Sequence, residues 1–300
     1  MKQRPLKAPL RIDFAGGWID LPDFSKLFQG HVVNVAISPQ IKLINGKVDF
    51  SPYKAGGGIS SSTGALILGQ LHLMSQYSSQ NKIHSTPAEF AETIFQLENH
   101  MIDFKIGRQD QYGIALGGLN CLRFGADEYH RHDFEVETHV SERTPNLQEL
   151  ESSLLLVHSG IQRPAQNIVE AVRRNIANRD PVHIKALKKI ANCGTRAAQA
   201  VQAQEYSQLA QIMSDNWEAQ KQFASECTNP EIDRLYQTML KNGAIGGKMC
   251  GAGGGGYFVF YCNNQKRVKQ KAKELGLQTI SPKFEMKNIL TLNDLVPHGN

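Results

Sequence analysis

The stretch GGKMCGAGGGGYFVFYC, residues 246–262, sets a very flexible segment against a very stiff one. Six of the ten residues in 247–256 are glycine, and they lead directly into Tyr-Phe-Val-Phe-Tyr. Aromatic and β-branched residues in a short apolar run predict a buried strand. Glycine has no Cβ, so the loop before this strand can lie directly against another backbone. The stretch therefore predicts a loop with a close neighbour, anchored by a buried strand.

The hydrophobic pattern is helical before this stretch and mixed, with both helix and strand, after it. Amphipathic segments follow one another from 165 to about 241, and a short helix and a last strand follow residue 262. The first half of the chain is richer in strand patterns, with a hairpin turn at Asn45-Gly46. Its predicted elements are strands at 10–14, 31–38, 41–50, 119–124 and 152–160, a helix at 65–74, and a helix that Ser85 caps.

This order predicts an α+β protein with two lobes and a cleft between them, because strands and helices are segregated along the chain. We expect the first lobe at residues 1–150 and the second at 151–300. Ligand sites are common in such clefts.

The composition is that of a folded, mildly basic protein. Of 300 residues 41% are hydrophobic and 20% charged, and 33 Lys and Arg against 28 Asp and Glu give a net charge of +5. The basic residues are scattered, which suits a small anionic ligand better than a nucleic acid. Five cysteines without CxxC spacing, and no signal-peptide pattern or long apolar run, favour the cytoplasm. We expect a small-molecule ligand, no nucleic acid, no membrane, and a monomer or homodimer.

The segment GGGISSSTG, residues 56–64, is a candidate phosphate-binding loop. Successive glycines let backbone N–H groups converge, and the following helix N-terminus adds partial positive charge. Neither GxxxxGK[ST] nor GxGxxG is present, so the loop is neither a Walker loop nor a Rossmann fingerprint. The alternative, with about equal weight, is a glycine-serine loop that only caps a buried helix.

Two other segments carry candidate chemistry. Glu98 and Asp110 stand twelve residues apart around a Gly-Arg-Gln turn, so one can hold a metal while the other faces a substrate hydroxyl. In APLRIDFAGGWID, Arg11 lies on a strand and Asp20 lies beyond a glycine turn, an arrangement that can form a polyol site. The alternatives are structural carboxylates for the first segment and a strand-end salt bridge for the second.

Taken together, APLRIDFAGGWID, GGGISSSTGAL and GGKMCGAGGGGYF resemble, in order, the three motifs of the GHMP kinases. The resemblance covers nearly the whole chain. Within that superfamily GRQDQYGIALGGLN is similar to D-glycero-D-manno-heptose 7-phosphate kinases, and FAGGWID is similar to fucokinases. Both branches phosphorylate an anomeric hydroxyl.

The resemblance implies a fold and an activity. The fold would have an N-terminal ribosomal-S5-like α/β lobe and a C-terminal ferredoxin-like α+β lobe with added helices. The activity would be ATP- and Mg²⁺-dependent transfer of the γ-phosphate to the C1 hydroxyl of a sugar or sugar phosphate, most like that of the heptose 7-phosphate kinases. A fucokinase- or galactokinase-like kinase of a free sugar, a kinase of a non-sugar alcohol, and a non-catalytic nucleotide-binding homologue are the alternatives.

The resemblance also implies roles for individual residues. Asp110 would accept or orient the proton of the attacking hydroxyl, Arg11 would stabilise that nucleophile, and Ser62 and Glu98 would reach magnesium. Arg163 would contact a substrate anion. The ATP phosphates would be wrapped by Gly56, Gly57, Gly58, Ser60, Ser61 and Ser62. The remaining substrate-binding residues would be Gly17, Asp20, Gly253 and Gly254. The segment before Gly56 is shorter than in the heptose kinases, which leaves the nucleotide preference open.

Overall fold

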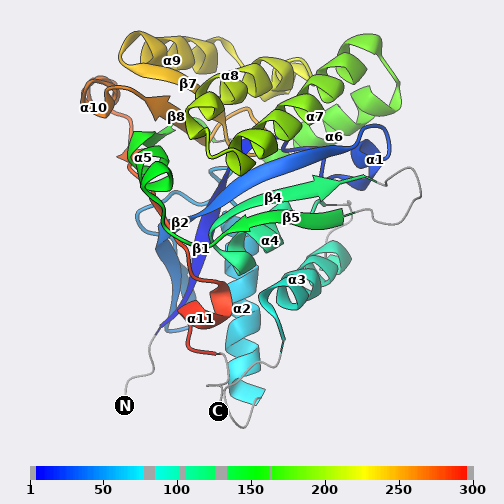
Figure 1. Ribbon diagram of the computed structural model, residues 1–300, viewed down its shortest axis with the longest axis vertical. Helices are drawn as coiled ribbons and strands as arrows, with labels where there is room; N and C mark the ends of the chain where they lie inside the picture. Colours follow the sequence, from blue (N-terminus) through cyan, green and yellow to red (C-terminus); the bar gives the residue numbers. More distant parts are fainter. Residues whose placement is uncertain (1–4, 78–84, 102–105, 126–133, 163, 296–300) are drawn as a thin grey trace.

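The computed structural model describes residues 5–77, 85–101, 106–125, 134–162 and 164–295, and it contains two antiparallel sheets with helices around them (Figure 1). The first sheet lies across the middle of the molecule, and the second lies above it among α8, α9 and α10. No helix in the described part of the chain is long and apolar enough to cross a bilayer.

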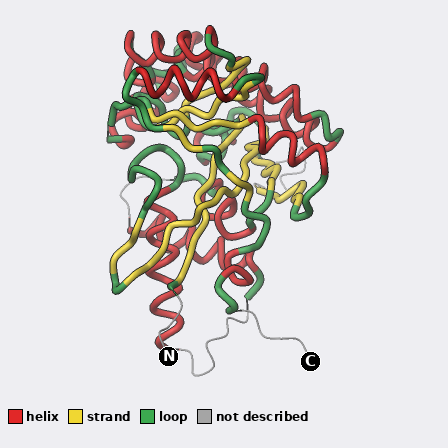
Figure 2. The backbone as a smooth tube through the Cα atoms, turned by 90° about the vertical axis from the view of Figure 1, so that its left-hand side faces the viewer, coloured by secondary structure: helices red, strands yellow, loops and turns green. Residues whose placement is uncertain are grey.

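The first sheet is built around a single long strand, β2 (Gly30–Ile44). Every other strand of this sheet except β5 pairs with β2, and the path runs β1-β2-β4-β5. Figure 2 shows these strands as a continuous twisted layer. The other strands are β1 (Leu6–Ala15), β3 (Lys47–Asp49), β4 (Leu119–Phe124), β5 (Phe134–Val140) and β10 (Lys283–Phe284).

The segments predicted as two strands at 31–38 and 41–50 are divided differently in the structure. One long strand, β2, covers 31–38 and the start of the second segment, and the rest of that segment turns back as β3. The strand β2 continues through Pro39, although proline cannot donate a ladder hydrogen bond. The register of β1 shifts between Ala8 and Leu10, opposite Pro39. The pairing of β1 with β2 therefore does not need a backbone N–H from Pro39. The turn at Asn45 and Gly46 is confirmed, with φ of 49° and 75°, and β3 follows it.

The second sheet has the order β7-β8-β6-β9. All six residues of β8 (Tyr257–Cys262) are buried, and β8 pairs with a strand on each side, which confirms the buried strand predicted at 257–261. The strand β7, which contains the start of the glycine-rich stretch, was not predicted. Besides β8, this sheet contains β6 (Leu154–His158), β7 (Ala244–Met249) and β9 (Thr279–Ile280), and β9 pairs with β6.

The helical stretch predicted from 165 to 241 is confirmed as four amphipathic helices. In α6, for example, Ile168, Ala171, Val172 and Ile176 are buried at helical spacing. The α-helices in the described part of the chain are α1 (Pro22–Ser25), α2 (Ser61–Tyr77), α3 (Pro87–Met101), α4 (Gln109–Leu116), α5 (Pro145–Ser153), α6 (Ala165–Ala177), α7 (Pro181–Gln202), α8 (Leu209–Gln220), α9 (Pro230–Lys241), α10 (Gln265–Glu274) and α11 (Ile289–Leu292).

The cap of α3 differs from the prediction. The residue that caps it is Thr86, and not Ser85, because the Thr86 hydroxyl accepts from Glu89 N and the Glu89 carboxylate accepts from Thr86 N. This reciprocal pair is a capping box, and it needs the Glu three residues after the cap. Since Glu89 is the acid in the first turn, the spacing selects Thr86.

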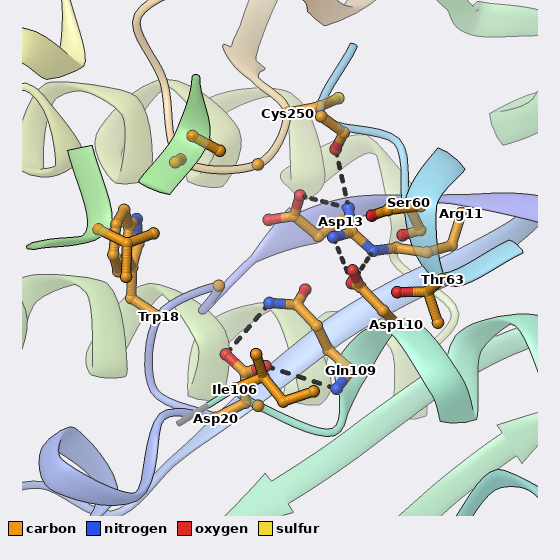
Figure 3. Close-up of a pocket in the computed structure, with 18 of the residues that line it drawn as sticks. Arg11, Asp13, Trp18, Asp20, Ser60, Thr63, Ile106, Gln109, Asp110 and Cys250 are labelled. Atoms are coloured by element: carbon orange, nitrogen blue, oxygen red, sulfur yellow. Dashed lines mark hydrogen bonds and ion pairs between the residues drawn. The ribbon is translucent and has the colours of Figure 1, made fainter. Parts of the chain in front are cut away.

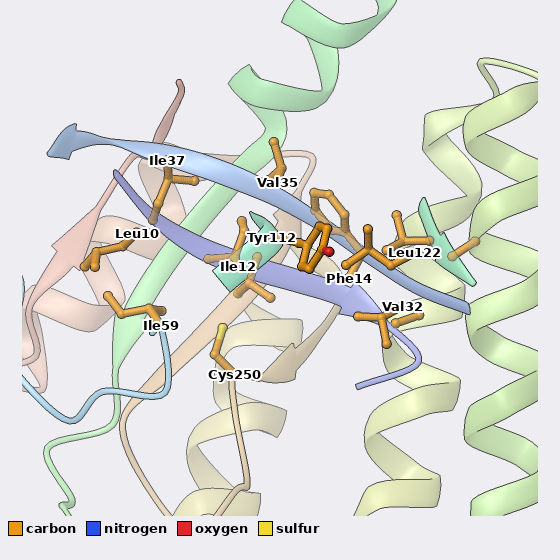
Figure 4. Packing of buried hydrophobic residues seen from close by; sticks show 14 of the residues in the cluster. Leu10, Ile12, Phe14, Val32, Val35, Ile37, Ile59, Tyr112, Leu122 and Cys250 are labelled. Carbon is orange, nitrogen blue, oxygen red and sulfur yellow. The ribbon is translucent and has the colours of Figure 1, made fainter. Parts of the chain in front are cut away.

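The main core lies against the first sheet. The helix α2 packs on β1 and β2 at Gly64, where a Cβ would lie 2.9 Å from the Ile41 side chain. The helices α7 and α8 pack against β1 as well, and Figure 1 shows them above the sheet while α2, α3 and α4 lie below it. Figure 4 shows the apolar side chains of this region, among them Leu10, Ile12, Phe14, Val32, Val35, Ile37, Ile59 and Leu122.

The last described residues return to the first sheet. The strand β10 pairs with β2, and α11 contacts β1 and α4. The predicted division of the chain at residue 150 stays a prediction, but the first sheet takes strands from both halves.

Candidate active site

A cavity of about 450 Å³ lies between the turn after β1, the N-terminus of α2, the first turn of α4 and the glycine loop after β7. Figure 3 shows the side chains of several lining residues pointing toward one another. Most residues that the sequence singles out line this cavity. They are Arg11, Gly17, Asp20, Gly56, Gly58, Ser60, Ser61, Ser62, Glu98, Asp110 and Gly253.

Three predicted site residues are not among the lining residues. Gly57 packs against β8, because a Cβ there would lie 2.6 Å from the Tyr257 ring. Gly254 instead donates its N–H to Cys227 O at 2.7 Å. Arg163 lies outside the described residues. The sequence pattern could not separate these glycines from their neighbours, because each motif contains several in a row.

The candidate phosphate loop ends at the N-terminus of α2, as the sequence predicts. Ser60 has φ of 64°, and α2 begins at the next residue. The Ser61 hydroxyl accepts from Gly56 N at 2.8 Å, which closes the loop. The Ser60 hydroxyl is buried without a hydrogen-bond partner although it lines the cavity, and Ser62 is exposed. An unpartnered hydroxyl at a helix N-terminus fits a bound anion.

The glycine loop after β7 lies directly against the phosphate loop. A Cβ at Gly58 would lie 2.3 Å from Cys250 O, and one at Gly251 would lie 2.9 Å from Gly58 Cα. Tyr257 N also donates to Gly57 O at 3.0 Å. The close backbone approach predicted for the glycine-rich stretch is therefore confirmed, and its neighbour is the other glycine loop.

Arg11 and Asp110 form the central ion pair of the cavity. Arg11 Nε donates to Asp110 Oδ1 at 2.8 Å, and Nη1 donates to Gly58 O at 3.2 Å (Figure 3). Burial alone would lower the pKa of Arg11, but the carboxylates of Asp110 and Asp13 outweigh it and raise that pKa. Asp110 stands in the first turn of α4, where a negative charge is favourable. Arg11 thus links Asp110 to the phosphate loop.

Two further ionised residues stand behind Arg11, and the sequence analysis missed both. Asp13 Oδ1 accepts from Arg11 Nη1 at 3.4 Å, and Lys248 Nζ contacts Asp13 Oδ2. Burial would raise the pKa of Asp13, but Lys248 and Arg11 outweigh it and lower that pKa. Asp13 had a detectable signal, because residues two apart on a strand face the same side. Lys248 had one too, as a lone charge beside an apolar strand.

Asp20 lies across the cavity from the phosphate loop. Its carboxylate accepts from the side chain of Gln109 at 3.1 Å and from Gln109 N at 3.4 Å. Burial and the nearby charge of Asp110 raise the pKa of Asp20 to about 6, although the Gln109 hydrogen bonds oppose the rise. A Cβ at Gly107 would lie 1.8 Å from Asp20 Oδ2, so the chain passes very close to this carboxylate. Gln109 is a lining residue that the sequence analysis missed.

Glu98 projects from α3 to the hydroxyl-rich start of α2. Its carboxylate accepts from the Thr63 hydroxyl at 3.1 Å and from Gln111 Nε2 at 2.7 Å. Burial, together with the charge of Asp110, raises the pKa of Glu98 against these hydrogen bonds. The hydroxyl bonded to Glu98 is therefore that of Thr63, whereas Ser62 is exposed and lines the cavity.

The oxygen atoms of Glu98 and of the nearby hydroxyls are suitable ligands for a magnesium ion that also binds phosphate. Mg²⁺ is usually held by one or two carboxylates together with waters and substrate phosphates. Among the described residues no three His, Cys, Asp or Glu side chains gather into a metal site. Glu98 and the hydroxyls at the start of α2 would therefore complete a magnesium shell only together with nucleotide phosphates.

The remaining wall of the cavity is apolar. Trp18 packs edge-on against Phe223 at 5.6 Å between ring centroids, and Leu21, Ile106 and Val169 continue this wall. An apolar wall facing carboxylates and amides is typical of sites that bind a polyol, because a sugar has both polar edges and an apolar face.

The comparisons with known proteins agree with the geometry. Residues 197–278 match the family model described as GHMP kinases C terminal. D-glycero-alpha-D-manno-heptose 7-phosphate kinase of Campylobacter jejuni is 23% identical over 333 residues, which cover 92% of this chain and 95% of that protein. Bifunctional fucokinase/GDP-fucose pyrophosphorylase of Arabidopsis thaliana is 21% identical over 91% of this chain and 31% of that protein.

A solved structure shows the same fold. The galactokinase of Lactococcus lactis, in complex with galactose, superposes with a TM-score of 0.66 over 94% of each chain at 16% identity. The predicted two-lobed α+β fold is thereby confirmed.

Proposed function

We propose that this chain, which carries a GHMP kinase C-terminal domain and has the GHMP kinase fold, is an ATP-dependent sugar kinase that phosphorylates an anomeric hydroxyl. One observation carries the proposal: the Arg11–Asp110 pair stands between a phosphate-type loop and Asp20 in one cavity. The relatives named above, which are kinases of sugars or sugar phosphates, support the acceptor class.

The reaction needs a nucleophile held in line with the γ-phosphorus and neutralisation of the phosphate charge. Asp110 orients the attacking C1 hydroxyl and accepts its proton as the oxygen–phosphorus bond forms and ADP leaves. Arg11, bonded to both Asp110 and Gly58 O, keeps that hydroxyl beside the phosphates. Asp20 and Gln109 accept from and donate to other sugar hydroxyls. The phosphates lie on the N–H groups and hydroxyls of 56–62.

Magnesium would be held by Glu98 and a hydroxyl at the start of α2, and it would neutralise charge on the phosphate oxygens. Thr63 and Gln111 orient the Glu98 carboxylate for this purpose.

A free sugar is the second candidate acceptor beside a heptose 7-phosphate, and the charges of the cavity favour it. Arg11 is the one basic side chain among the described lining residues, and its donors are already bonded to Asp110, Asp13 and Gly58. A second phosphate on the acceptor would find no other cation in this described lining. Binding of a phosphorylated acceptor would therefore depend on Arg163, to which the resemblance assigns contact with a substrate anion.

The test is a panel of aldoses and aldose phosphates with ATP and magnesium, read by NMR of the products. We expect phosphorylation at C1 of at least one acceptor, and loss of that activity in Asp110→Ala. If the acceptor is phosphorylated, Arg163→Ala should raise its KM; if it is a free sugar, that KM should stay unchanged. ATP binding without transfer to any acceptor would instead support a non-catalytic nucleotide-binding protein.

We propose a cytoplasmic location and a monomeric or homodimeric protein. The five cysteines are all described, buried and unpaired, which is consistent with a reducing cytoplasm. A monomer or a homodimer is compatible with a cavity that one chain lines by itself.

A further inference from the structure

A row of four ionised side chains crosses the interior of the molecule and ends at Asp110. Lys248 contacts Asp13, Asp13 contacts Arg11, and Arg11 contacts Asp110, so the charges alternate. The side chains of Lys248, Asp13 and Arg11 are 1%, 4% and 5% exposed. The row also joins the two sheets, since Lys248 belongs to β7 and Asp13 to β1.

Arg11 is bonded unequally to its two carboxylate partners, because Nε and Nη2 both donate to Asp110 whereas only Nη1 donates to Asp13. Arg11 Nε lies 2.8 Å from Asp110 Oδ1, whereas Nη1 lies 3.4 Å from Asp13 Oδ1. Asp13 is nevertheless the more deeply buried of the two carboxylates, because the Asp110 side chain is 27% exposed. In a low-dielectric interior a buried carboxylate attracts a neighbouring guanidinium strongly. Some other group must therefore satisfy Asp13.

Lys248 is that group. Its ammonium contacts Asp13 Oδ2 and lies 3.4 Å from the backbone oxygen of the same residue. Because Lys248 neutralises Asp13, Arg11 can keep its hydrogen bonds to Asp110 and Gly58 O. A buried lysine is costly unless it is paired, so its presence next to this carboxylate calls for a reason that packing alone does not supply.

We propose that Lys248 and Asp13 are positioning residues for phosphoryl transfer, acting through Arg11 to set the position of the Asp110 carboxylate against the phosphate loop. This inference rests on the proposed function and deepens it. Lys248 is not among the residues that line the cavity, and Asp13, which does line it, has its carboxylate bonded to Lys248 and Arg11. The effect of this pair is on the geometry of the reacting groups, and therefore on kcat rather than on the KM for ATP.

The first test is Lys248→Met. With the ammonium gone, Asp13 competes with Asp110 for Arg11, and kcat should fall by about 10- to 100-fold, as for other small misplacements of reacting groups. The KM for ATP should change by less than about twofold, because the phosphate loop is untouched. Lys221→Met is the matched control, since Lys221 pairs with Glu218 at 2.7 Å outside the cavity, and its kcat should equal that of the wild type.

Two double variants separate positioning from packing. Adding Asp13→Asn to Lys248→Met removes the competing carboxylate and should restore kcat to within about threefold of the wild type, since a buried ion pair can often be replaced as a unit. In an Arg11→Met background, Lys248→Met should lower kcat by less than about twofold more, because residues that act as a unit are non-additive.

Each outcome decides the inference. A folded Lys248→Met with wild-type kcat overturns it, and so does a loss that Asp13→Asn fails to relieve and that adds in full to Arg11→Met. If circular dichroism finds Lys248→Met unfolded, Lys248→Gln, which can still donate to Asp13 without a charge, takes its place under the same criteria. If the wild-type chain phosphorylates no acceptor, the proposed function fails, and this inference with it; activity in the wild type with no effect at Lys248 overturns this inference alone.

Discussion

The cavity has two sides that differ in chemistry. The side formed by β1 and α4 carries ionised groups, of which Arg11 and Asp110 are the central pair. The other side is formed by two glycine loops in close contact, and apart from the serines at the start of α2 it offers mostly peptide groups, one of which, Gly58 O, accepts from Arg11. We infer that the charged side performs the chemistry and that the glycine side sets the distances. Substitutions on the two sides should then separate turnover from stability.

The largest effect is expected on the charged side, from Asp110→Asn. The amide keeps the shape and one acceptor for Arg11 but cannot take the proton, so kcat should fall by about 10²- to 10⁴-fold. The free energy of unfolding should change by only about 1 kcal/mol. Kinase assays and urea unfolding check the two quantities. Asp215→Asn is the control, since Asp215 pairs with Arg196 outside the cavity. Wild-type kcat in Asp110→Asn would contradict the inference that the charged side performs the chemistry.

On the glycine side, Gly58→Ala should act mainly on stability. A Cβ at Gly58 would lie 2.3 Å from Cys250 O, and φ is 78°. Left-handed strain and the clash together should lower the free energy of unfolding by about 2–4 kcal/mol. Gly46→Ala is the matched control, because Gly46 has φ of 75° and nothing within 4 Å, so it carries the strain alone, about 1–2 kcal/mol. Equal losses at both positions would show that the two loops do not press on one another.

The charged side should also give the protein a pH dependence, through Asp20. Its pKa rises from the ordinary 3.8 to about 6 on folding, mainly by burial. Between these values the folded protein keeps a proton that the unfolded chain has lost, so stability falls as the pH rises from about 4 to 6. The change is roughly 2–3 kcal/mol. Urea unfolding of the wild type and Asp20→Asn should differ by this slope; parallel pH profiles would contradict the burial of an ionisable Asp20.

The smallest effect is expected for Ser60→Ala. The Ser60 hydroxyl has no partner, so its loss should leave the free energy of unfolding unchanged and raise the KM for ATP by about 2- to 10-fold, the value of one hydrogen bond. Ser61→Ala is the contrasting variant, because its hydroxyl accepts from Gly56 N, and it should lose about 1 kcal/mol of stability. An unchanged KM in Ser60→Ala would mean that this hydroxyl does not face the nucleotide.

Local patterns predicted most of the helices and the central strand of the second sheet. The apolar run at 257–261 and the amphipathic repeat from 165 to 241 depend on residues close together in the chain, and the structure confirms both. Local patterns were wrong where a partner strand decides the outcome. The strand β2 continues through Pro39 because β1 shifts its register there, which nothing near Pro39 indicates.

The candidate site was predicted where local motifs carry it and missed where contacts between distant segments decide it. Arg11, Asp20 and Asp110 stand in recognisable motifs, and the structure brings all three to one cavity. The Thr63 partner of Glu98 and the Gln109 partner of Asp20 come from separate elements, so their hydrogen bonds could not be read from spacing.

By itself, the sequence determined the order of the elements, the glycine loops and the residue types needed to handle phosphate and sugar, because these depend on local backbone freedom and side-chain chemistry. The tertiary structure decided which charges meet. Lys248 and Asp13 are 235 residues apart, and they meet because β7 of one sheet and β1 of the other both pack on α8. Electrostatic pairing depends on distance and burial, and both are set when the two sheets pack together.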